Sequence, residues 1–351
     1  MRIGIIDVDN YKQLADCFPN LCLMKLSAWH KSQGDSVEWY TEMSHGHFDK
    51  VYLSKVFSFT DDVSFRIDAD EIVRGGSGYC IYVDENGAEY FDGLSDVALP
   101  YEIEHIMPDY SIYFNDDVDF YTVNGKKKLT KIGKKHRDTA YGYMSRGCPR
   151  GCPFCHVKDK PSDGRHSRKV ADLSEFWSGQ KYIQIYDPNT LACREWKDIL
   201  TQLIESGSHV EFNQGVDIRL MTQEKAEYLK KIKIERVHFA YDRYEDKKIV
   251  EPKLKQFADV SGFKRAKVMV YVLTNYNTSI EQDLARIMYI RSLNFTPYCM
   301  IYNKSSLKRG DIHFKLSRWV NYPAFFWKFP TFEDYLAVEK QTHGNRRISR
   351  N

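Results

Sequence analysis

Three cysteines lie close together near the middle of the chain, in residues 147–156. Their spacing, Cys148-x3-Cys152-x2-Cys155, is not a helical repeat that would place them in a core, and the surrounding glycines and prolines predict a tight loop. Convergent thiolates in such a loop bind soft metals. Four cysteines would close a structural zinc or iron–sulfur site, but no fourth cysteine lies nearby. The segment therefore predicts a 4Fe-4S cluster with one iron left open for another ligand.

This motif, with Phe154 before its last cysteine, resembles the cluster motif of the radical S-adenosylmethionine (SAM) superfamily. Residues 140–148 also resemble the strand and loop that open the barrel of that family. The resemblance implies that Cys148, Cys152 and Cys155 hold the cluster and that SAM chelates the open iron. Reduction would then cleave SAM to methionine and a 5′-deoxyadenosyl radical, which abstracts hydrogen from an unknown substrate. A one-electron donor such as flavodoxin or ferredoxin is the implied partner.

The composition gives no global signature of nucleic-acid binding, because 51 basic residues face 48 acidic ones for a net charge of +3. No signal peptide opens the chain, and no apolar run approaches the ~18 residues of a membrane span. We therefore expect a cytoplasmic protein that does not enter a membrane. The other cysteines are scattered, so we expect no second cluster; they are Cys17, Cys22, Cys80, Cys193 and Cys299.

The length favours two domains, and the first, residues 1–98, reads as a small open α/β domain. Strands are expected at 2–6, 37–40 and 51–54 and a helix at 20–33.

This domain resembles a reduced form of the cobalamin-binding domain that precedes the barrel in one radical SAM subgroup. Such a domain would carry Asp-x-His-x-x-Gly, whereas the nearest segment here lacks the Asp and has Gly34 one position late. We therefore interpret His30 as a surface helix residue and do not favour bound cobalamin. A cobalamin-dependent methyltransferase stays open as an alternative.

A linker and a basic hairpin are expected at residues 99–138. Asn124-Gly125 between two β-prone runs predicts a hairpin. The basic residues at 126–137 form the only dense charge cluster of the chain, and we favour a solvated edge over a nucleic-acid contact. Three polar residues of the linker are interpreted as helix-surface charge rather than metal ligands: Glu102, Glu104 and His105. The glycine-rich turn at 74–79 reads as a loop rather than a phosphate cradle.

From residue 139 the pattern alternates strand and helix, which predicts a partial (β/α)6 barrel over 139–304, as the resemblance also implies. The expected strands are 139–143, 182–186, 210–213, 237–240, 268–273 and 296–302. The expected helices are 173–177, 194–205, 222–231, 249–263 and 279–293. The aromatic-rich segment 305–351 is expected to pack across the open edge of the barrel or to form a surface for a partner.

Polar residues follow the strands of this barrel, at the ends where such barrels bind ligands. Arg219 suits the SAM carboxylate by bidentate pairing. Asp187 and Asn189 lie where the family places its contacts to the SAM amino group, and Gln214 and Asp217 suit the ribose or the substrate. Asp217 is also a candidate helix cap. Phe154 resembles the aromatic residue whose backbone flanks the adenine.

Two other kinds of protein remain open. One is a zinc-binding module that uses His156 as its fourth ligand, although His156 directly adjoins Cys155. The other is a cluster-bearing scaffold without turnover. A zinc protein would be colourless, whereas a cluster protein is brown and loses absorbance on reduction. Only the enzyme would form 5′-deoxyadenosine from SAM.

Overall fold

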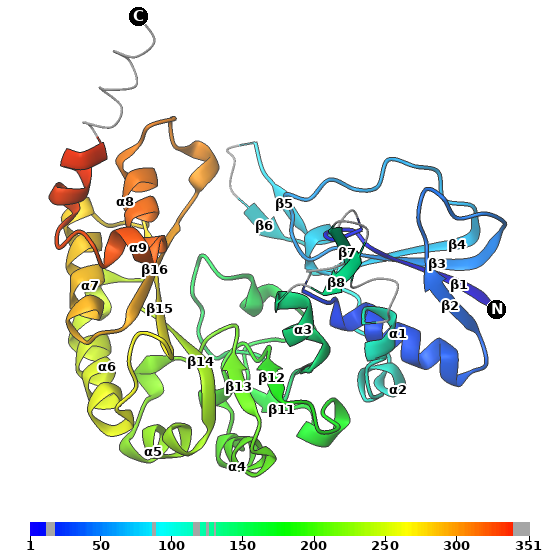
Figure 1. Cartoon of the computed structure of the whole chain (residues 1–351), viewed down its shortest axis with the longest axis horizontal. Coiled ribbons are helices and arrows are strands. Elements are labelled where there is room, and N and C mark those ends of the chain that lie inside the picture. Colours follow the sequence, from blue (N-terminus) through cyan, green and yellow to red (C-terminus); the bar gives the residue numbers. More distant parts are fainter. Residues whose placement is uncertain (12–17, 86–88, 115–119, 124–125, 130, 340–351) are drawn as a thin grey trace, which may run out of the picture. The chain divides into compact units, whose positions relative to one another are not determined.

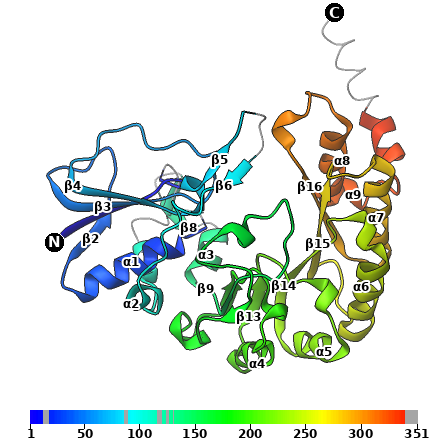
Figure 2. The same cartoon turned by 180° about the vertical axis from the view of Figure 1, so that it is seen from behind.

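The computed structural model describes residues 1–11, 18–85, 89–114, 120–123, 126–129 and 131–339 (Figures 1 and 2). The chain divides into two compact units, Met1–Gln214 and Gly215–Asn351. Both are mixed α/β with parallel sheets, as predicted. The predicted domain limits after residues 98, 138 and 304 stay a prediction. Within the described ranges, no helix combines the length and the apolar character that crossing a membrane requires.

The first unit begins with a sheet of four parallel strands in the order β2-β1-β3-β4. The strands are β1 (Arg2–Asp7), β2 (Ser36–Trp39), β3 (Phe48–Ser54) and β4 (Ala69–Gly75). Helix α1 (Leu21–Ser32) connects β1 to β2. The predicted strands at 2–6, 37–40 and 51–54 and the predicted helix at 20–33 are confirmed.

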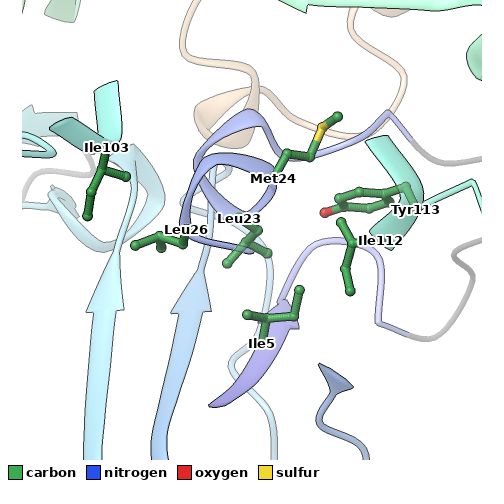
Figure 3. Close-up of a cluster of buried hydrophobic side chains, with 7 residues drawn as sticks. All are labelled: Ile5, Leu23, Met24, Leu26, Ile103, Ile112 and Tyr113. Atoms are coloured by element: carbon green, nitrogen blue, oxygen red, sulfur yellow. The ribbon is translucent and has the colours of Figure 1, made fainter. Parts of the chain in front are cut away.

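Helix α1 begins at Asn20, whose side chain accepts a hydrogen bond from the Leu23 amide, 3.3 Å away. Its apolar face packs against Ile5 of β1 and against Tyr113 (Figure 3). Seven buried residues form this cluster: Ile5, Leu23, Met24, Leu26, Ile103, Ile112 and Tyr113. Because residues from 103 to 113 belong to the same core, the linker is anchored to the N-terminal sheet.

His30 is not the surface residue that its helical position suggested, because it is only 9% exposed. Its Nδ1 lies 2.7 Å from an Asp35 carboxylate oxygen and its Nε2 lies 3.0 Å from the Tyr52 hydroxyl. The face of α1 that carries His30 is turned toward Tyr52 of β3, so the imidazole is enclosed. Because both ring nitrogens already have protein partners, neither is placed to bind a cobalt ion.

The linker forms α2 (Tyr101–Glu104) and a 3-10 turn η2 (Tyr110–Ile112). The interpretation as surface charge holds for Glu102 but is wrong for Glu104, whose carboxylate lies 3.0 Å from Arg146 and 3.4 Å from Lys25. Burial raises the pKa of Glu104, whereas Arg146 and Lys25 lower it. The lowering is larger, so the pKa of Glu104 lies below its usual value. His105 similarly contacts Glu175 at 2.6 Å. These ion pairs connect the linker to the segment that carries the cysteines.

Two antiparallel hairpins lie in this unit, β5 (Ile81–Val83) with β6 (Glu89–Phe91) and β7 (Phe120–Val123) with β8 (Lys126–Leu129). Val123 pairs with Lys126, which confirms the hairpin predicted at this place. The turn residues 124–125 of this hairpin lie outside the described residues. Helix α3 (Lys131–Arg137) follows.

The glycine-rich turn contains η1 (Ser77–Tyr79). Gly76 has φ +95°, and a Cβ there would lie 2.4 Å from the Lys55 carbonyl oxygen. Close packing on the Lys55 backbone thus accounts for Gly76, in agreement with the loop interpretation.

Three further strands of the first unit pair in parallel, with β12 between β9 and β13. They are β9 (Thr139–Gly142), β12 (Tyr182–Ile185) and β13 (His209–Phe212). Helix α4 (Trp196–Ser206) follows β12 and ends at Gly207, which has φ +64°. The helix expected at 173–177 is only a 3-10 turn, η4 (Leu173–Glu175), because Phe176 already leaves the helical conformation.

The second unit contains the parallel strands β14 (Lys233–Ala240), β15 (Val268–Thr274) and β16 (Thr296–Ile301), in that order. Alternate residues on one face, such as Val268, Val270 and Val272, are fully buried. Helices pack beside these strands, with α6 and α7 running along them in both views (Figures 1 and 2). The helices are α5 (Gln223–Lys231), α6 (Lys247–Ser261) and α7 (Ile280–Ser292), close to the predicted ranges.

The aromatic-rich segment folds into α8 (Ile312–Asn321) and α9 (Pro323–Phe326). Trp319 is fully buried, with its ring centroid 5.0 Å from that of Phe326 and 5.5 Å from that of Phe332. The Asn321 side chain accepts from the Cys299 amide at 2.7 Å and donates to the Cys299 carbonyl at 3.0 Å. The side-chain amide of Asn321 thereby pairs with the backbone of β16, an edge strand; that this segment closes a barrel stays a prediction.

Candidate functional site

The cysteine loop follows the short strand β10 (Ser145–Arg146), which pairs with β11 (Arg168–Lys169). Gly147 opens the loop with φ +85°, and a Cβ at this position would lie 2.3 Å from the His166 carbonyl oxygen. Only glycine fits both the conformation and the space. The Cys148 amide then donates to the Gly164 carbonyl at 3.2 Å. The path of the chain into the three cysteines is therefore fixed by residues 164–169.

The three cysteines of the loop, Cys148, Cys152 and Cys155, form no disulfide within the described residues and are partly buried. Burial raises the pKa of Cys155, a hydrogen bond from the Val157 backbone lowers it, and the charges of Cys152 and Cys148 raise it again. The Cys155 amide donates to the Cys152 carbonyl at 3.1 Å, so these two residues belong to one tight turn of the loop.

In the ranges that the structure describes, no three His, Cys, Asp or Glu side chains converge on one point where a single metal ion could be held. In an iron–sulfur cluster the cysteines bind different irons, so their sulfurs need not converge in this way.

Asn189 reaches the first of these cysteines from the loop after β12. Its Nδ2 donates to the Cys148 sulfur at 3.4 Å. The residue is only 2% exposed, and its Oδ1 is a buried acceptor with no hydrogen-bond partner in the described part of the chain. An unsatisfied buried carbonyl oxygen costs about 1–3 kcal/mol. The fold therefore keeps, beside a cysteine sulfur, an acceptor that a hydrogen-bond donor would satisfy.

Asp187 holds this loop in place. One carboxylate oxygen accepts from the Met144 amide at 2.7 Å, and the other accepts from the hydroxyls of Ser145 at 2.6 Å and Thr190 at 3.0 Å. Burial raises the pKa of Asp187, and these hydrogen bonds oppose the rise. Since Asp187 joins the loop after β12 to the strand that leads into the cysteines, it positions Asn189 against Cys148.

Arg146 lies immediately before the loop, with its guanidinium 4.0 Å from the centre of the Tyr143 ring. It pairs with Glu104 at 3.0 Å and with Asp163 at 3.5 Å. His156, the alternative fourth ligand, instead has its Nε2 4.0 Å from a Glu89 carboxylate oxygen.

Two other predicted residues lie in the first unit. Phe154 is partly buried within the cysteine loop, and Gln214 is exposed just after β13.

The remaining two predicted residues belong to the second unit, where they contact each other. Arg219 Nε lies 2.8 Å from Asp217 Oδ1, and its Nη1 lies 3.2 Å from Asp246 Oδ2. Asp217 also accepts from the Arg219 amide at 3.1 Å and thereby caps the 3-10 turn η6 (Ile218–Leu220). The capping role considered for Asp217 is confirmed, and the carboxylates that Arg219 binds here are those of the protein.

Sequence reasoning missed a buried ion pair at the carboxyl ends of β14 and β15. Arg286 and Asp283 of α7 are both fully buried, with their charged atoms 2.5 Å apart. Arg286 also donates to the backbone carbonyls of Tyr241 and Leu273. Burial raises the pKa of the nearby Asp242 to about 6, although Arg286 lowers it. The i, i+3 spacing of Asp283 and Arg286 was the only signal in the sequence, and it does not reveal burial.

Within the first unit, the structure brings Asp187 and Asn189 to the cysteine loop. The assignments to SAM all stay predictions: Phe154, Asp187, Asn189, Gln214, Asp217 and Arg219. No protein-family model matches the chain, and no curated protein matches its sequence significantly.

Proposed function

We propose that this protein is a radical SAM enzyme. Cys148, Cys152 and Cys155 would hold a 4Fe-4S cluster, and Asn189 would contact SAM beside it. The observation that carries the proposal is the position of Asn189. Its Nδ2 lies 3.4 Å from the Cys148 sulfur, and its Oδ1 is buried without a partner among the described residues.

The residues present fit such a cofactor pair. When bound, the cluster and SAM would supply a 5′-deoxyadenosyl radical, formed by reductive cleavage of the sulfonium C–S bond. Hydrogen bonds to cluster sulfurs tune the reduction potential, and Asn189 is placed to give one to Cys148. The SAM ammonium is a donor that would satisfy the Asn189 carbonyl oxygen. Asp187 holds the loop of Asn189 against the segment that leads into the cysteines. It accepts hydrogen bonds from Met144 and Ser145 of that segment and from Thr190 of its own loop.

The finer fold belongs to the same proposal. Six strands appear at the predicted places and are parallel within each unit, and polar residues follow the last five of them. This is the element order of the partial (β/α)6 barrel expected over 139–304. In barrels of parallel strands, ligands bind at that end.

The test is anaerobic incubation of reconstituted protein with dithionite and SAM, followed by measurement of 5′-deoxyadenosine. The proposal expects its formation by the natural protein and none above background by Cys148→Ala. Cys22→Ala, which removes a thiol outside the loop, is the matched control and should keep the activity. A brown protein that forms no 5′-deoxyadenosine would reduce the proposal to a cluster-bearing scaffold. A colourless protein with stoichiometric zinc would overturn it.

A further inference from the structure

One face of the sheet in the second unit carries aromatic side chains that are open to solvent. Because side chains alternate along a strand, Val268, Val270 and Val272 of β15 face the helices, whereas Tyr271 faces the other way. On the neighbouring strand, Tyr298 lies beside Tyr271 on the same side. We call this surface the open sheet face and define it by Tyr271, Tyr298, Met300 and Tyr302; His238, which adjoins it on β14, is only 4% exposed.

The composition and exposure of the open sheet face are unusual for a parallel sheet. Such sheets are normally covered on both faces, and barrel interiors are normally filled by branched aliphatic residues. Here Tyr298 is 40% exposed, Met300 45% and Tyr302 39%. Side chains of this size and exposure, gathered on one side of a sheet, form a surface suited to an apolar, flat ligand.

The rings on and beside the open sheet face form two groups, one across the strands and one beyond their ends. The His238 and Tyr271 rings are stacked, with centroids 5.2 Å apart and an interplanar angle of 3°. Tyr271 and Tyr298 meet edge to face at 5.8 Å. Beyond the strand ends, Tyr276 and Tyr302 meet in the same way at 4.8 Å. Contacts between neighbouring rings hold Tyr298 and Tyr302 in place, so little conformational freedom is lost when a flat ligand stacks on them.

Positive charge lies next to these rings, in the segment that follows β16. Lys304, Lys308 and Arg309 are all exposed, and in the described part of the chain none of them forms an ion pair. The adjacent acid, Asp311, is engaged with His313, whose Nδ1 lies 2.8 Å from its carboxylate. The three cations are therefore available to an anion beside Tyr302.

We propose that the open sheet face, together with the cations at 304–309, binds a single-stranded nucleic acid. Unpaired bases would stack on Tyr298 and Tyr302, and phosphates would lie beside Lys304, Lys308 and Arg309. Flat bases joined by anionic phosphates match exposed rings that are followed along the chain by cations, and stacking of bases on aromatic side chains is the usual way that proteins bind single strands. The inference goes beyond the proposed function, since its argument uses no residue of the cysteine loop.

The test uses the full chain and a fluorescein-labelled oligonucleotide of twelve uridines or twelve thymidines, followed by fluorescence anisotropy without SAM. Tyr298→Ala and Tyr302→Ala should each weaken binding about 10-fold, whereas Tyr298→Phe should bind within about twofold of the natural protein. Tyr322→Ala, at an exposed tyrosine just after α8, is the matched control and should change nothing. A Tyr298→Ala protein that binds as tightly as the natural one would overturn the proposal, as would a natural protein that shows no binding at about 100 μM.

Salt dependence tests the phosphate contacts separately. The double variant Lys308→Ala with Arg309→Ala should lower the slope of log Kd against log salt by about 1.4. A duplex of equal length, or uridine monophosphate, should bind at least about 10-fold more weakly than the single strand, because stacking needs unpaired bases and several phosphates contribute. Equal binding of the duplex or of the mononucleotide would overturn the proposal.

The outcome is distinguishable from that of the proposed function. Formation of 5′-deoxyadenosine by a protein that binds no oligonucleotide would remove this inference alone. Oligonucleotide binding with the expected variant pattern, by a protein that forms no 5′-deoxyadenosine, would remove only the enzyme assignment.

Discussion

The loop after β12 and the segment around η6 both carry polar residues predicted to bind SAM, yet they differ in how those residues are already engaged. Asn189, beside Cys148, keeps a buried acceptor that no residue in the described part of the chain satisfies. Arg219 instead contacts two carboxylates, those of Asp217 and Asp246. A polar residue at the end of a strand therefore marks a ligand site only when the protein has not supplied the partner itself. Mutation of a polar residue should therefore weaken cofactor binding in the loop after β12 and lower the stability of the protein around η6.

The largest effect is expected in the cysteine loop. Cys155→Ser should abolish retention of iron after anaerobic reconstitution, because an alcohol is a poor ligand for a soft metal centre and a three-cysteine set has no spare thiolate. Iron and sulfide analysis with the visible spectrum provides the measurement. Cys22→Ser removes another partly buried thiol and should keep the full iron content. If Cys155→Ser retained as much iron as Cys22→Ser, the loop would not be the cluster site.

The second expected effect concerns the pH dependence of stability and a buried carboxylate outside both regions. Asp7 is fully buried at the end of β1, and its Oδ1 also has no partner in the described chain. Burial raises the pKa of Asp7 from 3.8 to about 6, against hydrogen bonds from Tyr113 and Asn10. Since the folded pKa lies above the unfolded one, the folded state binds more protons, and stability should fall by about 2 kcal/mol as pH rises from 4 to 7.

Urea unfolding of the cluster-free protein at several pH values measures this dependence. Asp7→Asn cannot titrate, so the part of the pH dependence that Asp7 contributes should disappear in that variant. If the two proteins lost stability in parallel between pH 4 and 7, the raised pKa of Asp7 would be excluded.

A third effect concerns Asn189 itself. Asn189→Ala should weaken SAM binding about 10-fold or more, because a hydrogen bond to a charged group contributes about 1.5–3 kcal/mol. Its free energy of unfolding without SAM should change little, since the buried carbonyl oxygen that it removes had no partner. Equilibrium dialysis with reconstituted protein and urea unfolding give the two quantities. Gln33→Ala, an exposed change at the end of α1, is the control. A large loss of stability with unchanged SAM affinity would make Asn189 a structural residue.

The elements could be read from the sequence more fully than the environment of single polar residues. A run of mostly branched apolar residues such as 268–273 predicts a buried strand, because few other structures fit such a run. His30 and Glu104 were misjudged because their partners, Tyr52 and Arg146, are distant in sequence and become neighbours only after folding. For the same reason the sequence placed Asn189 and Arg219 in one class. The cysteine loop was the exception, because its spacing, glycines and thiol chemistry all lie within ten residues.

The smallest expected effect lies in the second region. Asp217→Ala should lower the stability of the protein by about 1–2 kcal/mol, because it removes both the cap of η6 and a partly buried partner of Arg219. Asp246→Asn removes one partner of the same guanidinium without touching the cap and should cost less than about 1 kcal/mol. Both are measured by urea unfolding, with SAM affinity determined in parallel. Asp217 acts through protein structure if stability falls while affinity holds. The reverse pattern would make it a cofactor contact and would erase the difference between the two regions.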